Sequence, residues 1–137
     1  MNRRYLRIRQ ETVLAAVGFS TTRSASLDPA GRWVIIRDVA LPAGYNRPAT
    51  DILFELPPDY PLTPPDWFFC DPGRRGPKGR LPAHYFERQP GFAATAEGWA
   101  GGSLHIKGWR PGATPLQGHS LLTACHLAQG AFRRWIR

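Results

Sequence analysis

A proline-rich segment in the middle of the chain interrupts two apolar runs, and no regular strand or helix can pass through it. The flanking runs, residues 52–56 and 67–70, are rich in β-forming side chains. Proline lacks the N–H that a sheet ladder needs and biases the preceding residue toward extended geometry. We therefore expect a strand, a stiff polyproline-like corner that includes Tyr60, and a second strand. The prolines are at positions 57, 58, 61, 64 and 65.

Two further strands are expected before this corner. A Ser/Thr-rich edge strand over residues 19–27 leads into the turn at residues 28–31, where proline occupies the second position. Residues 33–39 form the next strand, with Val39 on the same face as Trp33. Short connections favour an antiparallel meander of four sequential strands.

Helices are expected at both ends of the chain. Residues 4–17 place Ile8 and Thr12 near one face, and Gly18 supplies a stop. Residues 114–136 begin with a Thr-Pro-x-Gln capping pattern. An apolar stripe runs along this second helix and predicts that it packs across the sheet. Its members are Leu121, Cys125, Ala128, Phe132 and Ile136.

The stretch 71–108 is rich in glycine and proline and shows no sustained periodicity, so we expect a long irregular loop. Long loops within compact domains are commonly functional. With 137 residues and 42% hydrophobic content, the chain suits a single α+β domain over residues 1–137.

Composition excludes several classes of protein. Two distant cysteines exclude a disulfide scaffold, and His119 and His126 have poor spacing for a metal, so we expect no metal and no cofactor. The N-terminus has no apolar core of the kind that signal peptides contain, and no apolar run reaches membrane-spanning length, so a cytoplasmic protein is expected. The net charge of +8 permits nucleic-acid binding as an alternative function, but the arginines are scattered and no nucleic-acid motif is present.

Four short motifs in order resemble the ubiquitin-conjugating enzyme (UBC) superfamily, in particular bacterial members encoded beside ubiquitin-like modifiers and activating enzymes. Residues 57–65 match the Tyr-Pro-x-x-Pro-Pro signature between two strands. Leu-Pro-x-Gly-Tyr at residues 41–45, Pro-Asp-x-Phe at residues 65–68 and Trp-Arg-Pro-Gly at residues 109–112 complete the set. The resemblance spans roughly residues 15–137 and implies a UBC-like fold with an active-site loop over 71–108.

The resemblance also implies partners, namely a ubiquitin-like modifier and its activating enzyme. In the family, basic residues of the first helix meet the activating enzyme, which makes Arg3, Arg4 and Arg7 candidate contacts. A solvated basic face is the alternative interpretation. The corner in relatives also offers a docking surface for downstream enzymes, and here its residues are Tyr60, Pro61, Pro64 and Pro65.

The chain departs from the family at the expected catalytic residues. A conjugating enzyme needs a cysteine thiolate to accept the acyl group as a thioester. The family places it in the long loop before the tryptophan-proline segment, after a His-Pro-Asn tripeptide. Here residues 101–109 contain no cysteine, and no His-Pro-Asn occurs anywhere in the chain.

Three accounts of the chemistry follow. Cys70 is the nucleophile at the end of its strand, or it is a buried small hydrophobic residue. Alternatively, Ser103 replaces the cysteine and His105 acts as base or orienting group, although His105 also suits an anchoring role in the loop. In the third account catalysis is absent, and the chain is an adaptor that binds the modifier or the activating enzyme.

Overall fold

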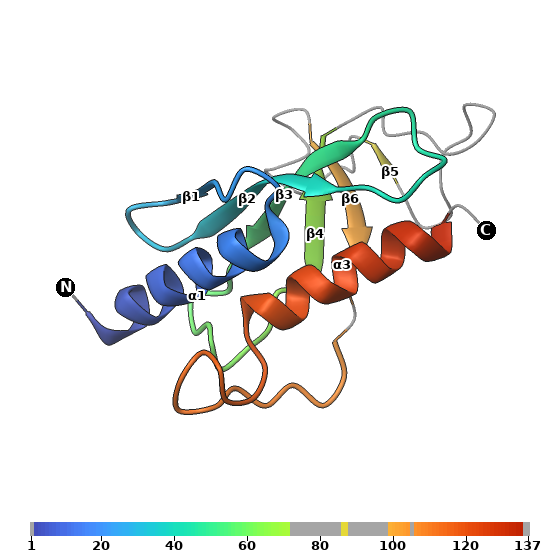
Figure 1. Cartoon of the computed structure of the whole chain (residues 1–137). Helices are drawn as coiled ribbons and strands as arrows, with labels where there is room; N and C mark the ends of the chain where they lie inside the picture. The colour runs from blue at the N-terminus through green and yellow to red at the C-terminus, as the bar shows by residue number, and fades with distance from the viewer. Residues whose placement is uncertain (1, 72–85, 88–98, 105, 136–137) are drawn as a thin grey trace.

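The computed structural model describes residues 2–71, 86–87, 99–104 and 106–135, and it places two helices against one face of an antiparallel sheet (Figure 1). This arrangement confirms the expected α+β class and the UBC-like order of helix, meander and helix. Among the described residues, none of the helices has the length and apolarity needed to cross a bilayer. The elements are α1 (Arg3–Phe19), β1 (Ala25–Leu27), β2 (Trp33–Ala40), β3 (Ala49–Glu55), β4 (Trp67–Cys70), β5 (Phe86–Glu87), β6 (Ala100–Ser103) and α3 (Leu121–Trp135).

The sheet has the strand order β1-β2-β3-β4-β6-β5, and all neighbouring strands are antiparallel. The first four strands confirm the predicted meander, although β1 is shorter than the edge strand expected over residues 19–27. The turn between β1 and β2 forms as predicted, since the Gly31 N–H donates to the Asp28 carbonyl at 2.8 Å.

The stretch 71–108 is not wholly irregular, which corrects the sequence-based expectation. Strand β6 lies within it and continues the sheet by pairing with β4. Gly101 pairs opposite Phe69, and Gly102 opposite Phe68. Because glycine brings only backbone to this pairing, β6 carries no apolar alternation by which sequence analysis could detect a strand.

The predicted facing of β2 is wrong at Val39. Val34 and Ile36 are buried in the main core as expected, and Val39 joins them on that face, whereas Trp33 packs against a smaller cluster. The register with β3 shifts between Ile36 and Val39, which marks a β-bulge. The extra residue of the bulge reverses the alternation of side chains after Ile36.

Helix α1 begins at an Asn2 cap, whose side chain accepts the Tyr5 backbone N–H at 2.7 Å. The helix continues one residue beyond the stop predicted at Gly18. Its buried face includes the predicted Ile8 and Thr12, and it also includes a charged residue, Glu11.

Helix α3 begins at Leu121 rather than at the predicted start near Thr114. The Ser120 hydroxyl accepts the Leu122 N–H, and the Ser120 N–H donates to the Thr123 hydroxyl, so Ser120 is the functioning cap. Residues 114–117 form a turn instead, and Gly118 has a φ of +78°, which is incompatible with a continuous helix. The apolar stripe is confirmed at four fully buried residues, while Ile136 lies outside the described residues. The four residues are Leu121, Cys125, Ala128 and Phe132.

The main core lies between the two helices and the sheet, and Phe132 of α3 is central to it. The ring of Phe132 packs edge-on against Phe68 of β4, with 5.5 Å between centroids. It also packs edge-on against Tyr45, at 5.7 Å, and the Tyr45 hydroxyl donates to the Phe132 carbonyl at 2.7 Å. This contact fixes the loop before β3 onto the end of α3.

Removal of the Phe132 side chain tests this packing. We expect Phe132→Ala to lower the free energy of unfolding by about 3–5 kcal/mol, because it deletes a fully buried ring and leaves a cavity. The measurement is urea unfolding followed by circular dichroism. The exposed His126 on the same helix supplies the control, His126→Ala. Equal midpoints for the two variants would show that the ring does not stabilise the core.

Candidate functional site

The corner between β3 and β4 is built from turns around a buried tyrosine. The Tyr60 N–H donates to the Pro57 carbonyl, and the Leu62 N–H donates to the Asp59 carbonyl, each at 2.9 Å. This pair of turns replaces the extended polyproline geometry expected from the sequence. Tyr60 is fully buried, whereas Leu62 at the tip of the corner is 74% exposed.

A buried carboxylate, that of Glu11 on α1, joins the corner to both helices. Glu11 Oε1 accepts the Tyr60 hydroxyl and, at 2.8 Å, the backbone N–H of Leu121 at the start of α3. Glu11 Oε2 accepts Nε of Arg7 at 3.0 Å in an ion pair. A buried carboxylate is tolerated only when such donors replace water, so three segments are held by one side chain.

The loop from Trp109 to His119 packs against the corner. Trp109 Nε1 donates to the Pro61 carbonyl at 2.8 Å, and its ring lies 6.1 Å from that of Tyr60. The Trp109 ring also stacks on the His119 ring, with 5.6 Å between centroids. His119 closes the loop through two hydrogen bonds to the backbone of Arg110. The imidazole Nδ1 of His119 accepts the Arg110 backbone N–H at 2.7 Å, and the backbone N–H of His119 donates to the Arg110 carbonyl at 2.8 Å.

Two glycines allow this loop to be compact. A side chain at Gly112 would overlap the Gln117 carbonyl, and a side chain at Gly118 would crowd the backbone of Arg110. The Gly112 carbonyl accepts Nη1 of Arg7, which ties the loop to α1. The Trp-Arg-Pro-Gly motif therefore has a structural purpose here, which is to fold the loop back on itself beside α1.

The three arginines predicted to meet the activating enzyme differ in their surroundings. Arg7 is mostly buried, forms an ion pair with Glu11 and donates a hydrogen bond to the Gly112 carbonyl of the loop. Arg4 Nη2 donates to the Pro57 carbonyl at 2.9 Å and to the Gly31 carbonyl at 3.2 Å. Arg3 is exposed at the start of α1. Arg4 and Arg7 therefore hold the fold together, and Arg3 is the arginine whose side chain is open to solvent.

The corner residues predicted as docking contacts also differ in their exposure to solvent. Tyr60 and Pro65 are buried, whereas Pro61 and Pro64 are partly exposed on either side of Leu62.

The candidate nucleophiles lie at opposite ends of the β4–β6 pair. Cys70 pairs with Ala100, and Ser103 pairs with Trp67 at the other end, so the two backbones are separated by about 10 Å. The Cys70 thiol is fully buried in the main core. The Leu104 N–H donates to the Asp66 carbonyl at 2.8 Å and extends the pairing toward the corner. His105 lies outside the described residues.

Cys125 is a core residue, as its spacing on the helix predicted. It is fully buried, and burial raises the pKa of its thiol well above the ordinary value. Within the described part of the chain, no three His, Cys, Asp or Glu side chains gather in a way that would hold a metal ion.

Sequence analysis missed Glu11 as an organising residue. The available signal was a charged residue within a largely apolar helix face, with Arg7 one turn earlier at the spacing of a favourable ion pair. A buried position for that pair follows only once Tyr60 and the start of α3 are known to meet α1.

A hydroxyl deletion tests the junction at Glu11. We expect Tyr60→Phe to lower the free energy of unfolding by about 1.5–3 kcal/mol, because it removes a hydrogen bond to a buried carboxylate. The measurement is urea unfolding, with Tyr5→Phe at a partly exposed position of α1 as the control. If Tyr60→Phe unfolds at the wild-type midpoint, the hydrogen bond does not hold the corner.

Because of the same hydroxyl, we expect the free energy of unfolding to fall at alkaline pH. Burial, and then the neighbouring charge of Glu11, raises the pKa of Tyr60 far above its ordinary value. Above about pH 10 an unfolded tyrosine releases its proton while the folded one keeps it, so stability falls by about 1.4 kcal/mol per pH unit for this group. Unfolding free energies measured between pH 9 and about pH 11 should therefore decline less steeply in Tyr60→Phe than in wild type. Identical slopes would contradict the assignment.

Comparison with known proteins gives one family. No curated protein and no solved structure matches the chain. The family model described as "Prokaryotic E2 family E" matches residues 9–130, which include α1 from Arg9 onward, the corner, the Trp109–His119 loop and most of α3. Because this match covers nearly the whole chain, the protein belongs to the prokaryotic E2 family E, a bacterial branch of the UBC-like E2 proteins.

Proposed function

We propose that the chain is a ubiquitin-conjugating-enzyme-like protein of a bacterial ubiquitin-like modification pathway, in which it carries or presents the modifier for transfer. The strongest support is its membership of the E2 family over residues 9–130. Hydrogen bonds of Glu11 and Arg7 add to this, because they hold the corner, the Trp109–His119 loop and the start of α3 against α1. The partners implied are a ubiquitin-like modifier and its activating enzyme, and we propose the cytoplasm as its location.

For partner contacts we assign the exposed residues among those predicted from the family. Arg3 offers an exposed guanidinium to an acidic surface of the activating enzyme. Pro61 and Pro64 offer partly exposed rings beside the tip of the corner. Arg4, Arg7, Tyr60 and Pro65 contribute by holding these residues in place.

Acyl transfer through Cys70 would follow thioester chemistry. Its thiolate attacks the carbonyl of the thioester on the activating enzyme, a new S–C bond forms, and the thiolate of the activating enzyme leaves. An amine of the target then attacks the new thioester and expels the Cys70 thiolate. Because the thiol is fully buried, this route requires the end of β4 to open before the acyl group is accepted.

The alternative route uses Ser103 and His105. The serine hydroxyl attacks the thioester carbonyl while the histidine accepts its proton, an oxyester forms, and the C–S bond breaks to release the thiolate of the activating enzyme. An amine attacks an oxyester much less readily than a thioester, so this route favours a chain that holds the modifier rather than one that turns over rapidly.

A non-catalytic adaptor is the second candidate function, and the burial of Cys70 favours it. Residues 101–109, where the family places its cysteine, contain none. In this role the chain would present a modifier or an activating enzyme through the surface that surrounds Arg3 and the corner.

A charging reaction distinguishes these routes. The protein is mixed with a candidate modifier, its activating enzyme and ATP, and adducts are read by intact mass without reductant, while binding is measured by calorimetry. We expect wild type to bind the modifier or the activating enzyme. A thiol-labile adduct that is lost in Cys70→Ser establishes the cysteine route, with the equally buried Cys125→Ser as the matched control.

A thiol-resistant adduct that is lost in Ser103→Ala and reduced in His105→Ala establishes the oxyester route instead. Retained binding without any adduct establishes the adaptor. If the protein neither gains an adduct nor binds either partner, the proposed function is overturned.

A further inference from the structure

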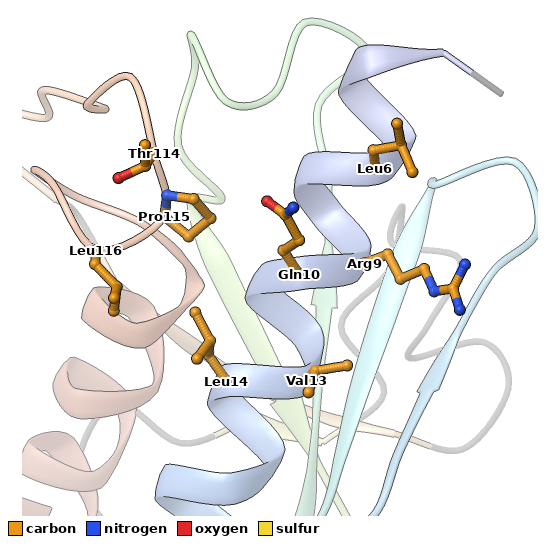
Figure 2. A pocket seen from close by; sticks show the side chains of 8 residues that line it. All are labelled: Leu6, Arg9, Gln10, Val13, Leu14, Thr114, Pro115 and Leu116. Carbon is orange, nitrogen blue, oxygen red and sulfur yellow. The ribbon is translucent and has the colours of Figure 1, made fainter.

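A groove runs along the outer side of α1, between this helix and residues 113–116 of the loop before α3. Its apolar part has a volume of about 530 Å³. Figure 2 shows Gln10 and Leu14 on the side of α1 that faces Pro115 and Leu116, with Leu6, Arg9 and Val13 along the same helix. Three of the large apolar side chains at the groove are unusually open to solvent, since Leu116 is 75% exposed, Val13 57% and Leu6 43%.

A basic part of about 470 Å³ continues the groove toward the start of α1. The two parts share four lining residues and therefore form one surface, which we call the α1 groove. The shared residues are Leu6, Gln10, Thr114 and Pro115. The basic part adds Arg3, Arg4 and Arg7, and among the described residues no aspartate or glutamate lines either part.

The positive charge of the α1 groove is largely uncompensated. Of the arginines that line it, Arg7 forms an ion pair with Glu11. Arg4 donates only to backbone carbonyls, and within the described part of the chain Arg3, Arg4 and Arg9 form no ion pair. An apolar surface with several unpaired guanidinium groups is complementary to an acidic partner that also has an apolar face.

The groove also favours a particular backbone conformation in that partner. The backbone groups of α1 are used within the helix, so this wall of the groove offers no sheet edge for an added strand. A partner bound here must satisfy its own backbone hydrogen bonds, as an α-helix does. From Leu6 to Leu14 the wall extends about 12 Å, which is just over two helical turns.

We infer that the α1 groove binds an amphipathic helix of a partner protein, whose apolar face covers Leu6, Val13, Pro115 and Leu116 and whose acidic flank meets Arg3 and Arg9. This inference deepens the proposed function, on which it rests, by naming the chemistry of a docking partner. It does not depend on which residue carries an acyl group.

The test is selection from a displayed library of random helix-forming peptides about 16 residues long. The full chain serves as bait. We expect enriched peptides to carry apolar residues at i, i+3 or i+4 and i+7, with an excess of Asp and Glu beside them. Fluorescence anisotropy then measures the affinity of synthetic copies for wild type and variants.

Matched variants identify the surface. We expect Val13→Glu and Leu116→Glu each to weaken binding at least about tenfold, which corresponds to about 1.4 kcal/mol. Val17→Glu is the control, because Val17 lies on the same helix with 58% exposure but does not line the groove. Arg9→Glu should also weaken binding, whereas Arg47→Glu, an equal change of charge in an exposed loop, should not.

The inference would be overturned if the enriched peptides showed no excess of acidic residues, or if Val13→Glu and Leu116→Glu left the peptide affinity unchanged. The charging reaction with the wild-type protein separates the two proposals. Wild type that gains no adduct and binds neither partner, but binds the selected peptides through the groove, counts against the proposed function alone. Normal charging with no groove-dependent peptide binding counts against the α1 groove alone.

Discussion

One buried carboxylate, that of Glu11, holds the three parts of the structure on which any function at this surface depends. An ionised group in the interior is stable only when hydrogen-bond donors replace its water, and here the donors come from α1, the corner and the first residue of α3. None of these parts satisfies the carboxylate alone. The carboxylate therefore couples the corner, the start of α3 and the basic face of α1 to one another.

The fold could be predicted where local patterns and tertiary packing agree. Prolines marked the corner, and the apolar stripe of α3 marked its buried face, because both signals act within a few residues. Strand β6 escaped prediction because Gly101 and Gly102 contribute backbone rather than side chains to the sheet. The early start predicted for α3 failed for a different reason. Residues 114–117 satisfy local capping rules, but the left-handed Gly118 and the Ser120 cap prevail once the loop folds against α1.

For the candidate site, sequence motifs pointed to two segments but not to the contact between them. The Tyr-Pro and Trp-Arg-Pro-Gly motifs lie in segments that meet in the structure, yet the bond from Trp109 to the Pro61 carbonyl joins positions 48 residues apart and leaves no local pattern. The sequence alone does not distinguish the roles of Arg3, Arg4 and Arg7 at the start of α1. Their different surroundings arise from Glu11 and from the carbonyls of Pro57 and Gly112, which only the tertiary structure brings near.

The close packing at Gly112 and Gly118 has a consequence for the thermodynamics of association. Because the backbone of the Trp109–His119 loop leaves no room for a Cβ at either glycine, the loop is held by direct steric contact as well as by hydrogen bonds. A loop that is already ordered loses little conformational entropy when another protein binds to it. A larger residue at either position would leave a looser loop, and that loop would bind a partner more weakly even where the domain still folds. Selection for glycine at these two positions would then act on binding affinity as much as on folding.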